Sequence, residues 1–342
     1  MGLCETSNVI DSKQGNNSNY IDKTTTSASS HLMHPTSSDD IPVESIEYIN
    51  ENNNNSYSQN PLEVNNEIIF SDTDKEVEDI FEKINLLGNG PFGEVWLVKH
   101  KKLEKQFAMK IINKKPIHDI NKVKDLITDL NKLEDKYLLK ILQTHITSNK
   151  TYIITDYCEE GSLNHKILEK KIFTEEELNS FYLYRALKGI KYLHVSGLYH
   201  NNIKPENIMI INGKIKLIDF WMFLLFPEED NNITLGNSLI YKSPEELKGN
   251  YSETSDLWSF GIIMYTMLMG IVPFKEKNIQ ELLKLEEMGQ YDTNSEGYLK
   301  LSKSAKKLIR KLLVFNPEQR IKAREAINHN WFLFKSYESI HI

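Results

Sequence analysis

Few cysteines and no long apolar run limit the kinds of protein that this sequence encodes. Only Cys4 and Cys158 occur among its 342 residues, which excludes a disulfide framework and a cysteine zinc site and is typical of a reducing compartment. The N-terminus has neither the basic flank nor the apolar core of a secretory signal. The most apolar run, WSFGIIMYTMLMGIVPF from Trp258, is too short and too interrupted for a comfortable transmembrane span, and it predicts a helix buried on all sides.

An excess of positive charge is also absent, so the sequence carries no footprint of nucleic-acid binding. The net charge of −7 comes from residues 1–76, which hold 13 acidic residues and three lysines, whereas the rest of the chain holds 35 acidic and 38 basic residues. Residues 1–76 are also rich in Ser, Thr and Asn, without a sustained apolar period. Such a segment cannot bury enough apolar surface to offset its ordering entropy, and we predict a disordered acidic tail.

The rest of the chain changes from a strand-rich to a helix-rich pattern. Strands are predicted at FEKINLLG, GEVWLVKH, QFAMKII, LLKILQTHI and TYIITDY, with one helix over residues 120–133 between them. After Gly161 helices dominate, apart from a strand pair at NIMIIN and KIKLID. A small β-rich part followed by a larger α-rich part predicts an α+β fold with two lobes.

The first residues, MGLCET, match the acceptor pattern for N-myristoylation, in which removal of Met1 exposes the amine of Gly2. A single myristoyl chain binds membranes only marginally, and the acidic tail is repelled by anionic lipid. Cys4 is therefore the expected second anchor, as an S-palmitoyl site. The sequence predicts a cytoplasmic protein at the inner face of a membrane, with a chance pattern at Gly2 and an idle thiol at Cys4 as the alternatives.

The segment LGNGPFGEV places Gly88, Gly90 and Gly93 between two predicted strands in a G-x-G-x-x-G-x-V pattern. Glycines at these positions let backbone N–H groups approach phosphate oxygens that a Cβ atom would exclude. The pattern alone is a weak signal, because it also suits a plain hairpin. The next predicted strand, FAMKII, carries Lys110. This combination resembles the start of a protein kinase domain, in which Lys110 would pair with the α- and β-phosphates of ATP.

The motifs that follow appear in the order of the eukaryotic protein kinase family, and the resemblance extends from Phe81 to about Phe332. NIKPEN resembles the catalytic loop, IDFW the metal-binding DFG segment, SPEEL the APE segment and SDLWSFG the core helix with its anchoring aspartate. Within the family, TYIITDYCEEGSL and INHNWF are most similar to the calcium/calmodulin-dependent and calcium-dependent Ser/Thr kinases. No D-x-D-x-D-G loop follows, so we expect no intrinsic calcium-binding module.

The resemblance implies a kinase-like domain over residues 77–335 that binds ATP and Mg²⁺. The N-lobe is expected at about 81–157 and the C-lobe at about 158–335, followed by a tail at 336–342. Asn207 and Asp219 are the expected metal ligands, Lys204 approaches the γ-phosphate, and Glu245 pairs with Arg320 in a structural ion pair. The residues expected to hold the nucleotide are Leu87, Gly88, Asn89, Gly90, Gly93, Val95, Ala108, Lys110, Thr155 (the gatekeeper), Asp156, Cys158 and Met209.

Several positions depart from the family pattern, and in the family these positions serve phosphoryl transfer. Asn202 stands at the position of the catalytic base, where its amide can orient a hydroxyl but cannot take up the proton; general base catalysis contributes about 10²–10⁴-fold in rate. Asn201 replaces the arginine that grips a phosphorylated activation loop. Trp221 replaces the glycine of DFG, where a peptide flip needs φ > 0, and a surface tryptophan without consequence is the alternative interpretation.

The helix expected to give Lys110 a glutamate partner lacks one. The expected position holds Leu126, although a register shifted by one residue would bring Asp125 there, and Asp129 is a turn away.

Peptide recognition is also expected to be weakened. Two positions at which basophilic relatives bind substrate arginines with glutamates hold Ser162 and Thr266, and only Glu206 remains.

These departures together predict a pseudokinase: a membrane-tethered domain that binds ATP and Mg²⁺ and acts as a scaffold or allosteric partner of another protein. The alternative is a weakly active Ser/Thr kinase that transfers the ATP γ-phosphate to protein hydroxyls, because Asn202 is nearly isosteric with aspartate and the metal and lysine set is complete. A structural domain without nucleotide is the third hypothesis. The sequence identifies neither the partner nor the substrate.

Overall fold

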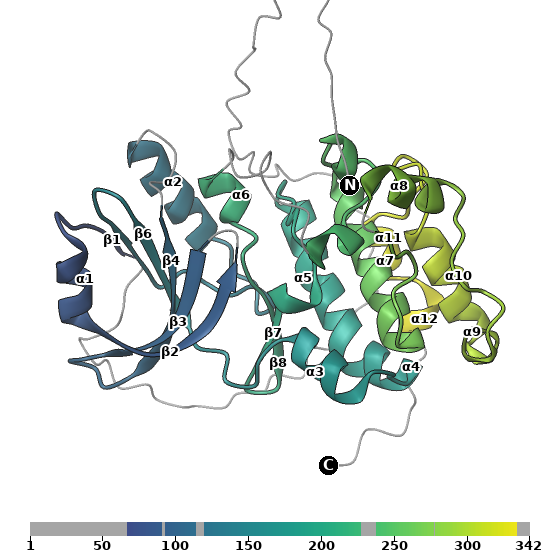
Figure 1. Cartoon of the computed structure of the whole chain (residues 1–342), viewed down its shortest axis with the longest axis horizontal. Coiled ribbons are helices and arrows are strands. Elements are labelled where there is room, and N and C mark those ends of the chain that lie inside the picture. The colour runs from purple at the N-terminus through teal and green to yellow at the C-terminus, as the bar shows by residue number, and fades with distance from the viewer. Residues whose placement is uncertain (1–66, 91–92, 114–119, 227–236, 277, 334–342) are drawn as a thin grey trace, which may run out of the picture. The chain divides into compact units, whose positions relative to one another are not determined.

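The computed structural model describes residues 67–90, 93–113, 120–226, 237–276 and 278–333 (Figure 1). A sheet-based N-lobe precedes a helical C-lobe, which confirms the predicted α+β fold with two lobes. The predicted lipid acceptors Gly2 and Cys4, the tail up to residue 66 and the C-terminal tail at 336–342 lie outside the described residues.

The N-lobe is built on a sheet whose described strands run in the order β1-β5-β6-β4-β3-β2. Neighbouring strands are antiparallel except for the parallel pair β1–β5. Successive side chains of a strand point to opposite faces, and in the central strands apolar residues point both ways, so each face of the sheet has its own apolar cluster. The strands are β1 (Glu67–Phe70), β2 (Phe81–Gly90), β3 (Gly93–His100), β4 (Gln106–Ile112), β5 (Gln143–Ile146) and β6 (Thr151–Asp156).

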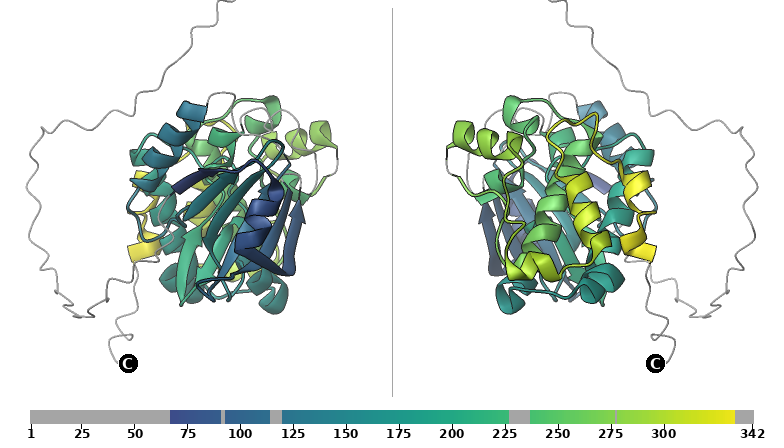
Figure 2. Two further views of the ribbon diagram at one scale, coloured as in Figure 1. Left: turned by 90° about the vertical axis from the view of Figure 1, so that its left-hand side faces the viewer. Right: turned by 90° about the vertical axis from the view of Figure 1, so that its right-hand side faces the viewer.

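Two helices cover these two faces. Helix α1 (Asp74–Ile80) lies across the outer face, where Val77 packs into a cluster with Phe107, Met109 and Ile154 (Figure 2, left). Helix α2 (Ile120–Asn131) covers the inner face through the larger cluster that continues into the C-lobe. The sheet is thereby held between α1 and the rest of the domain.

The predicted boundary between tail and domain is wrong for residues 67–76. These residues form β1 and the start of α1 instead of belonging to the tail. Asp74 accepts a hydrogen bond from Thr147 Oγ1 at 2.8 Å and pairs with Lys150 Nζ at 2.8 Å. Because β1 gains its hydrogen bonds from β5, some seventy residues later in the chain, the local composition carried no sign of it.

The C-lobe is arranged around helix α7 (Glu253–Met269). Every residue from Thr254 to Leu268 is buried, which confirms the predicted helix buried on all sides. Gly270 ends the helix at φ +71°, a left-handed conformation that glycine adopts without strain. No described helix has the length and apolarity needed to cross a membrane.

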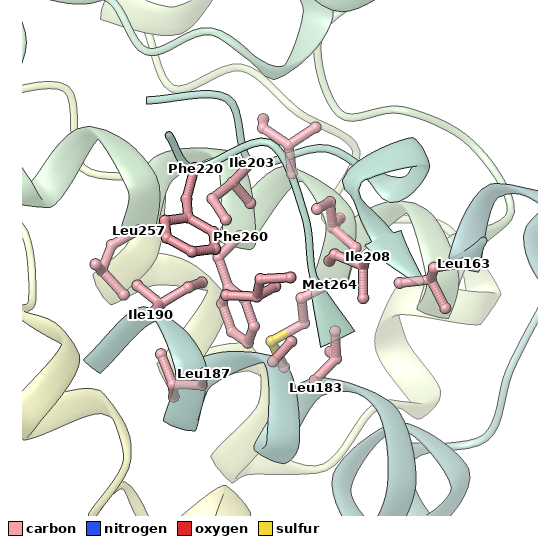
Figure 3. Close-up of a cluster of buried hydrophobic side chains, with 14 of the residues drawn as sticks. Leu163, Leu183, Leu187, Ile190, Ile203, Ile208, Phe220, Leu257, Phe260 and Met264 are labelled. Carbon is pink, nitrogen blue, oxygen red and sulfur yellow. The ribbon is translucent and has the colours of Figure 1, made fainter. Parts of the chain in front are cut away.

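Helices α5 (Leu183–Val195) and α10 (Lys303–Leu312) pack against α7, and a short hairpin lies where the two lobes meet. Figure 3 shows Leu187 and Ile190 of α5 close to Leu257 and Phe260 of α7. Burial of each such side chain contributes about 1.5–3 kcal/mol. The hairpin is β7 (Ile208–Ile211) with β8 (Lys214–Leu217), and the helices are α3 (Leu163–Lys170), α4 (Glu175–Glu177), α5 (Leu183–Val195), α6 (Met222–Leu225), α8 (Ile279–Glu287), α9 (Glu296–Lys300), α10 (Lys303–Leu312), α11 (Ala323–Ala326) and α12 (Asn330–Leu333).

The ion pair expected between Glu245 and Arg320 is formed and buried. The guanidinium donates from Nη1 to Oε1 at 2.5 Å and from Nη2 to Oε2 at 2.9 Å, and Ser255 Oγ donates to the same carboxylate at 2.7 Å. The guanidinium also donates to the carbonyl oxygens of Thr254 and Val314. The pair therefore joins the segment before α7 to the segment before α11.

Replacing Arg320 by methionine should destabilise the domain by about 3–5 kcal/mol, because the Glu245 carboxylate would stay buried without its cation. Denaturant unfolding measures the change. The double variant Glu245→Gln/Arg320→Met should recover much of the loss, because it buries no net charge. A single variant that loses less than about 1 kcal/mol would contradict this description.

A second buried carboxyl, that of Glu286 on α8, has no hydrogen-bond partner among the described residues. Burial raises its pKa to about 8, and the nearby carboxylates of Glu245 and Glu246 act in the same direction, while Arg320 and Lys248 oppose them. Burial likewise raises the pKa of Glu246 to about 7. Both groups bind a proton more tightly in the folded than in the unfolded protein.

Stability should therefore fall as pH rises from about 7 to 8, since the unfolded chain has already lost a proton that Glu286 retains in the folded domain. At lower pH the buried histidines His145 and His200, whose pKa burial lowers, act in the opposite direction. Thermal unfolding across this range measures the slope. Glu286→Gln should flatten the slope, whereas the same change at the exposed neighbour Glu287 should not. Equal slopes for wild type and Glu286→Gln would show that Glu286 does not titrate there.

Candidate active site

The segment after α5 is held by one buried carboxylate of α7. Asp256 accepts hydrogen bonds from the backbone N–H groups of His200 at 2.8 Å and Asn201 at 2.9 Å, and His194 Nε2 lies 2.8 Å from the same carboxylate. Burial alone raises the pKa of Asp256, but these hydrogen bonds outweigh it and hold the pKa below its ordinary value. Asn201 has φ +59°, a left-handed conformation that asparagine tolerates better than most residues.

The residues after Asn201 bring three predicted site residues together. Asn207 ends the 3₁₀ turn Pro205–Asn207, and its Nδ2 donates to the backbone oxygen of Asn202 at 2.9 Å. The backbone oxygen of Asn207 accepts from Ile218 N at 3.0 Å, which ties the loop to the end of β8. Lys204 is half-buried; burial lowers its pKa, while Glu206 and Asp219 act against this. Asn202 is also half-buried, so its amide is partly accessible.

Lys110 and Asp219 form an ion pair across the two lobes. Lys110 Nζ of β4 donates to Asp219 Oδ2 at 2.5 Å, and their side chains are only 11% and 16% exposed. Asp219 has φ +64°, in the left-handed region. The contact brings together the residue expected to bind phosphate and the residue expected to bind metal.

Phe220 and Trp221, which follow Asp219, are both buried. The ring of Phe220 lies among Ile203, Leu257 and Phe260 in Figure 3, with its centroid 6.4 Å from that of His200. Trp221 is 3% exposed, which excludes the interpretation of an inconsequential surface tryptophan. Its φ of −91° is negative, so the backbone at this position does not require glycine.

The orientation of α2 decides between the two registers left open by the sequence. Leu126 is half-buried and packs against the inner apolar cluster, whereas Asp125 is exposed. Asp129 pairs with Lys132 at 2.8 Å. The position facing the sheet is therefore occupied by leucine, and Asp125 does not replace the expected glutamate.

The strands place the predicted nucleotide residues on one face of the sheet. Val95 lies opposite Lys110 in the β3–β4 pair, and Ala108 lies opposite Thr155 in the β4–β6 pair. Side chains two residues apart point to the same face, so Val95, Ala108, Lys110 and Thr155 share the inner face. Met209 of β7 is half-buried on the hairpin that faces this sheet from the C-lobe.

The glycine-rich hairpin has the openness that a phosphate ligand requires. A Cβ atom at Gly88 or Gly90 would meet nothing within 4 Å, and Asn89 and Leu87 are exposed, Leu87 by 44% of its surface. Gly93 is different: its φ is +116°, and a Cβ there would lie 2.0 Å from the backbone oxygen of Ile111. Gly93 therefore shapes the hairpin, while Gly88 and Gly90 leave space.

The predicted hinge follows β6. The side chain of Asp156 points toward Lys105, with 3.6 Å between carboxylate and ammonium. Cys158 is buried, and burial together with Asp156 raises the pKa of its thiol to about 12. The thiol is therefore protonated and unreactive.

The residues present fit ATP with Mg²⁺. Asp219 supplies carboxylate oxygens and Asn207 an amide oxygen, the hard oxygen donors that Mg²⁺ prefers. Lys110 and Lys204 supply positive charge for phosphates, and the exposed Leu87 offers an apolar surface to an aromatic base.

Two of the positions expected to recognise peptides hold buried hydroxyl side chains that contact groups within the domain. Ser162 is buried at the start of α3, with its hydroxyl 3.2 Å from His165 Nδ1, and Thr266 is buried in α7, donating to Ile262 O at 2.7 Å. Glu206 keeps one carboxylate oxygen buried without a hydrogen-bond partner in the described ranges.

Two features of the site were not predicted from the sequence: the contact of His194 with Asp256 and the contact of Trp221 with Lys110. Lys110 Nζ lies 5.6 Å from the centroid of the Trp221 ring. His194 had no sequence signal of its own, because a lone histidine in a helical pattern is common in cores. The contact of Trp221 with Lys110 depends on how two distant segments of the chain are placed.

Comparison with known proteins agrees with this geometry. The family model for the protein kinase domain matches residues 81–332. Calcium-dependent protein kinase 5 of Plasmodium berghei (strain Anka) is 31% identical over 304 residues, which is 87% of this chain and 54% of the relative. Calcium-dependent protein kinase 5 of Plasmodium falciparum (isolate 3D7) is 32% identical over 277 residues, 79% of this chain and 48% of the relative.

The fold and the site thus define a protein kinase domain, and the chain belongs to the protein kinase family. Its resemblance to calcium-dependent protein kinases confirms the group that the motifs indicated. The chain spans about half the length of these curated relatives.

Proposed function

We propose that this domain binds ATP with Mg²⁺ and is impaired in phosphoryl transfer, acting as a pseudokinase on a protein partner. The observation that carries the proposal is that Asn202, with an amide side chain, stands at the catalytic-base position of a loop whose other contacts are formed. The contacts of Asp256 with His200 and Asn201, and of Asn207 with Asn202, support an ordered loop.

In the proposed mechanism each residue positions charge. Lys110 and Lys204 would hold phosphate oxygens, and the side-chain oxygens of Asp219 and Asn207 would hold Mg²⁺, which would supply positive charge against the phosphates. Asn202 orients a substrate hydroxyl by hydrogen bonding. Its amide has no site for the proton of the hydroxyl, so transfer loses the contribution of a general base.

The alternative is a weakly active Ser/Thr kinase. It is favoured by the loop geometry and by Glu206, the one peptide-reading glutamate that the sequence retains. Because the transition state of phosphoryl transfer is loose, loss of the base lowers the rate by about 10²–10⁴-fold without abolishing it.

Millimolar ATP with Mg²⁺ should raise the melting temperature of the purified protein, because a ligand that binds only the folded state stabilises it. Lys110→Ala should greatly reduce this ligand-induced shift, whereas Lys122→Ala, an exposed lysine on α2, should preserve it. A wild-type protein with no shift would contradict nucleotide binding.

Transfer of radiolabelled phosphate to a peptide array should be slow in the wild type and faster, by about 10²-fold or more, in Asn202→Asp, which restores a general base. Asp219→Ala should abolish any transfer. If Asn202→Asp leaves the rate unchanged, the missing base is not the limiting defect. A wild-type rate equal to that of ordinary kinases would refute the proposed impairment.

We also propose that the protein is held at the inner face of a membrane by N-myristoyl Gly2 and S-palmitoyl Cys4. The acceptor pattern supports this, and the second chain is needed because one acyl chain binds only marginally. Gly2→Ala should release the protein fully and Cys4→Ser partly in membrane fractionation. Full retention of both variants would exclude lipid anchoring.

A further inference from the structure

Two departures from the kinase pattern, Leu126 and Trp221, belong to the same apolar cluster. Leu126 of α2 packs against this cluster from the position expected for glutamate. Trp221 is a buried member of the cluster and directly precedes α6. Helices α2 and α6 contact each other and lie side by side in Figure 1. The helix that carries Leu126 therefore meets the helix that Trp221 precedes.

Trp221 also contacts the charged group that the missing glutamate would have served. The ammonium of Lys110 lies 2.5 Å from Asp219 Oδ2 and 5.6 Å from the centroid of the Trp221 ring. A cation over an aromatic face is attracted to it, most strongly where both are shielded from water. Residues 219–221 thus give Lys110 both an anion and a ring face.

The reason for tryptophan at this position lies in its side chain. The backbone of Trp221 has ordinary angles, and the packing of Phe220 against His200 does not involve the indole. Glycine in its place would remove the ring from the cluster against which α2 packs.

We propose that Trp221 is a positioning residue that replaces the missing glutamate of α2. Its indole gives Lys110 an additional partner and, with Leu126, joins α2 to the segment after Asp219 by apolar contact. The inference rests on the proposed nucleotide site and deepens it: a metal ion entering that site competes with Lys110 for Asp219, so Mg²⁺ adds little to nucleotide affinity.

The first test needs no nucleotide. Leu126→Glu and Trp221→Gly should each lower the melting temperature, the first by placing a charge in the apolar cluster and the second by leaving a cavity. In the double variant the introduced carboxylate gains the vacated space and reaches Lys110, so the loss should be clearly smaller than the sum of the two single losses.

The matched control is Leu133→Glu, at a half-buried leucine just beyond α2 that packs against the same cluster. Its combination with Trp221→Gly should give additive losses. The proposal is overturned if Leu126→Glu/Trp221→Gly is as additive as this control.

The second test asks for an effect that simple packing would not produce. The measured quantity is the ATP affinity with Mg²⁺ divided by the ATP affinity with a chelator. This ratio should be small in the wild type and in Trp221→Phe, which keeps a ring. It should rise several-fold in Leu126→Glu/Trp221→Gly, where Lys110 is drawn away from Asp219. Equal ratios in wild type and double variant would overturn the proposal.

The two tests also separate this inference from the proposed function. If the wild type binds no ATP, nucleotide binding is refuted, and the stability comparison still decides whether Trp221 and Leu126 act together.

Discussion

The hydrogen bonds that Asp256 accepts join the buried helix α7 to the loop that carries Asn202, Lys204 and Asn207. The carboxylate lies within α7 and receives the backbone N–H groups of His200 and Asn201. Leaving either the carboxylate or these N–H groups unpaired in the interior would carry a desolvation cost, so the loop has little freedom to move. The positions of Asn202, Lys204 and Asn207 follow from this contact.

This arrangement separates the parts that support the loop from the groups that perform chemistry. The supporting contacts, such as Glu245 with Arg320 and Phe220 near His200, are all present. Asn202 differs from aspartate in charge but hardly in shape, so the loop accommodates it without altering its hydrogen bonds to Asp256. A different residue at the base position therefore does not require a change in the contacts that hold the loop.

The segment after Asp219 illustrates how one departure permits another. The leucine on α2 cannot pair with the ammonium of Lys110, and its apolar side chain needs an apolar neighbour. Trp221 supplies bulk for the apolar cluster and a ring face near the ammonium. The carboxylate of Asp219 balances the charge of the Lys110 ammonium, so this pair carries no net charge.

The sequence by itself determined the two-lobed fold, the limits of most strands and the buried helix α7, because periodicity and motif order can be read locally along the chain. The pairing of Glu245 with Arg320 was expected only from the resemblance to the kinase family. Only the tertiary structure decided that residues 67–76 join the domain, that Leu126 rather than Asp125 faces inward, and that Trp221 is buried beside Lys110. Each of these depends on which distant segment supplies the hydrogen bonds or covers the apolar surface. Local composition does not contain that information.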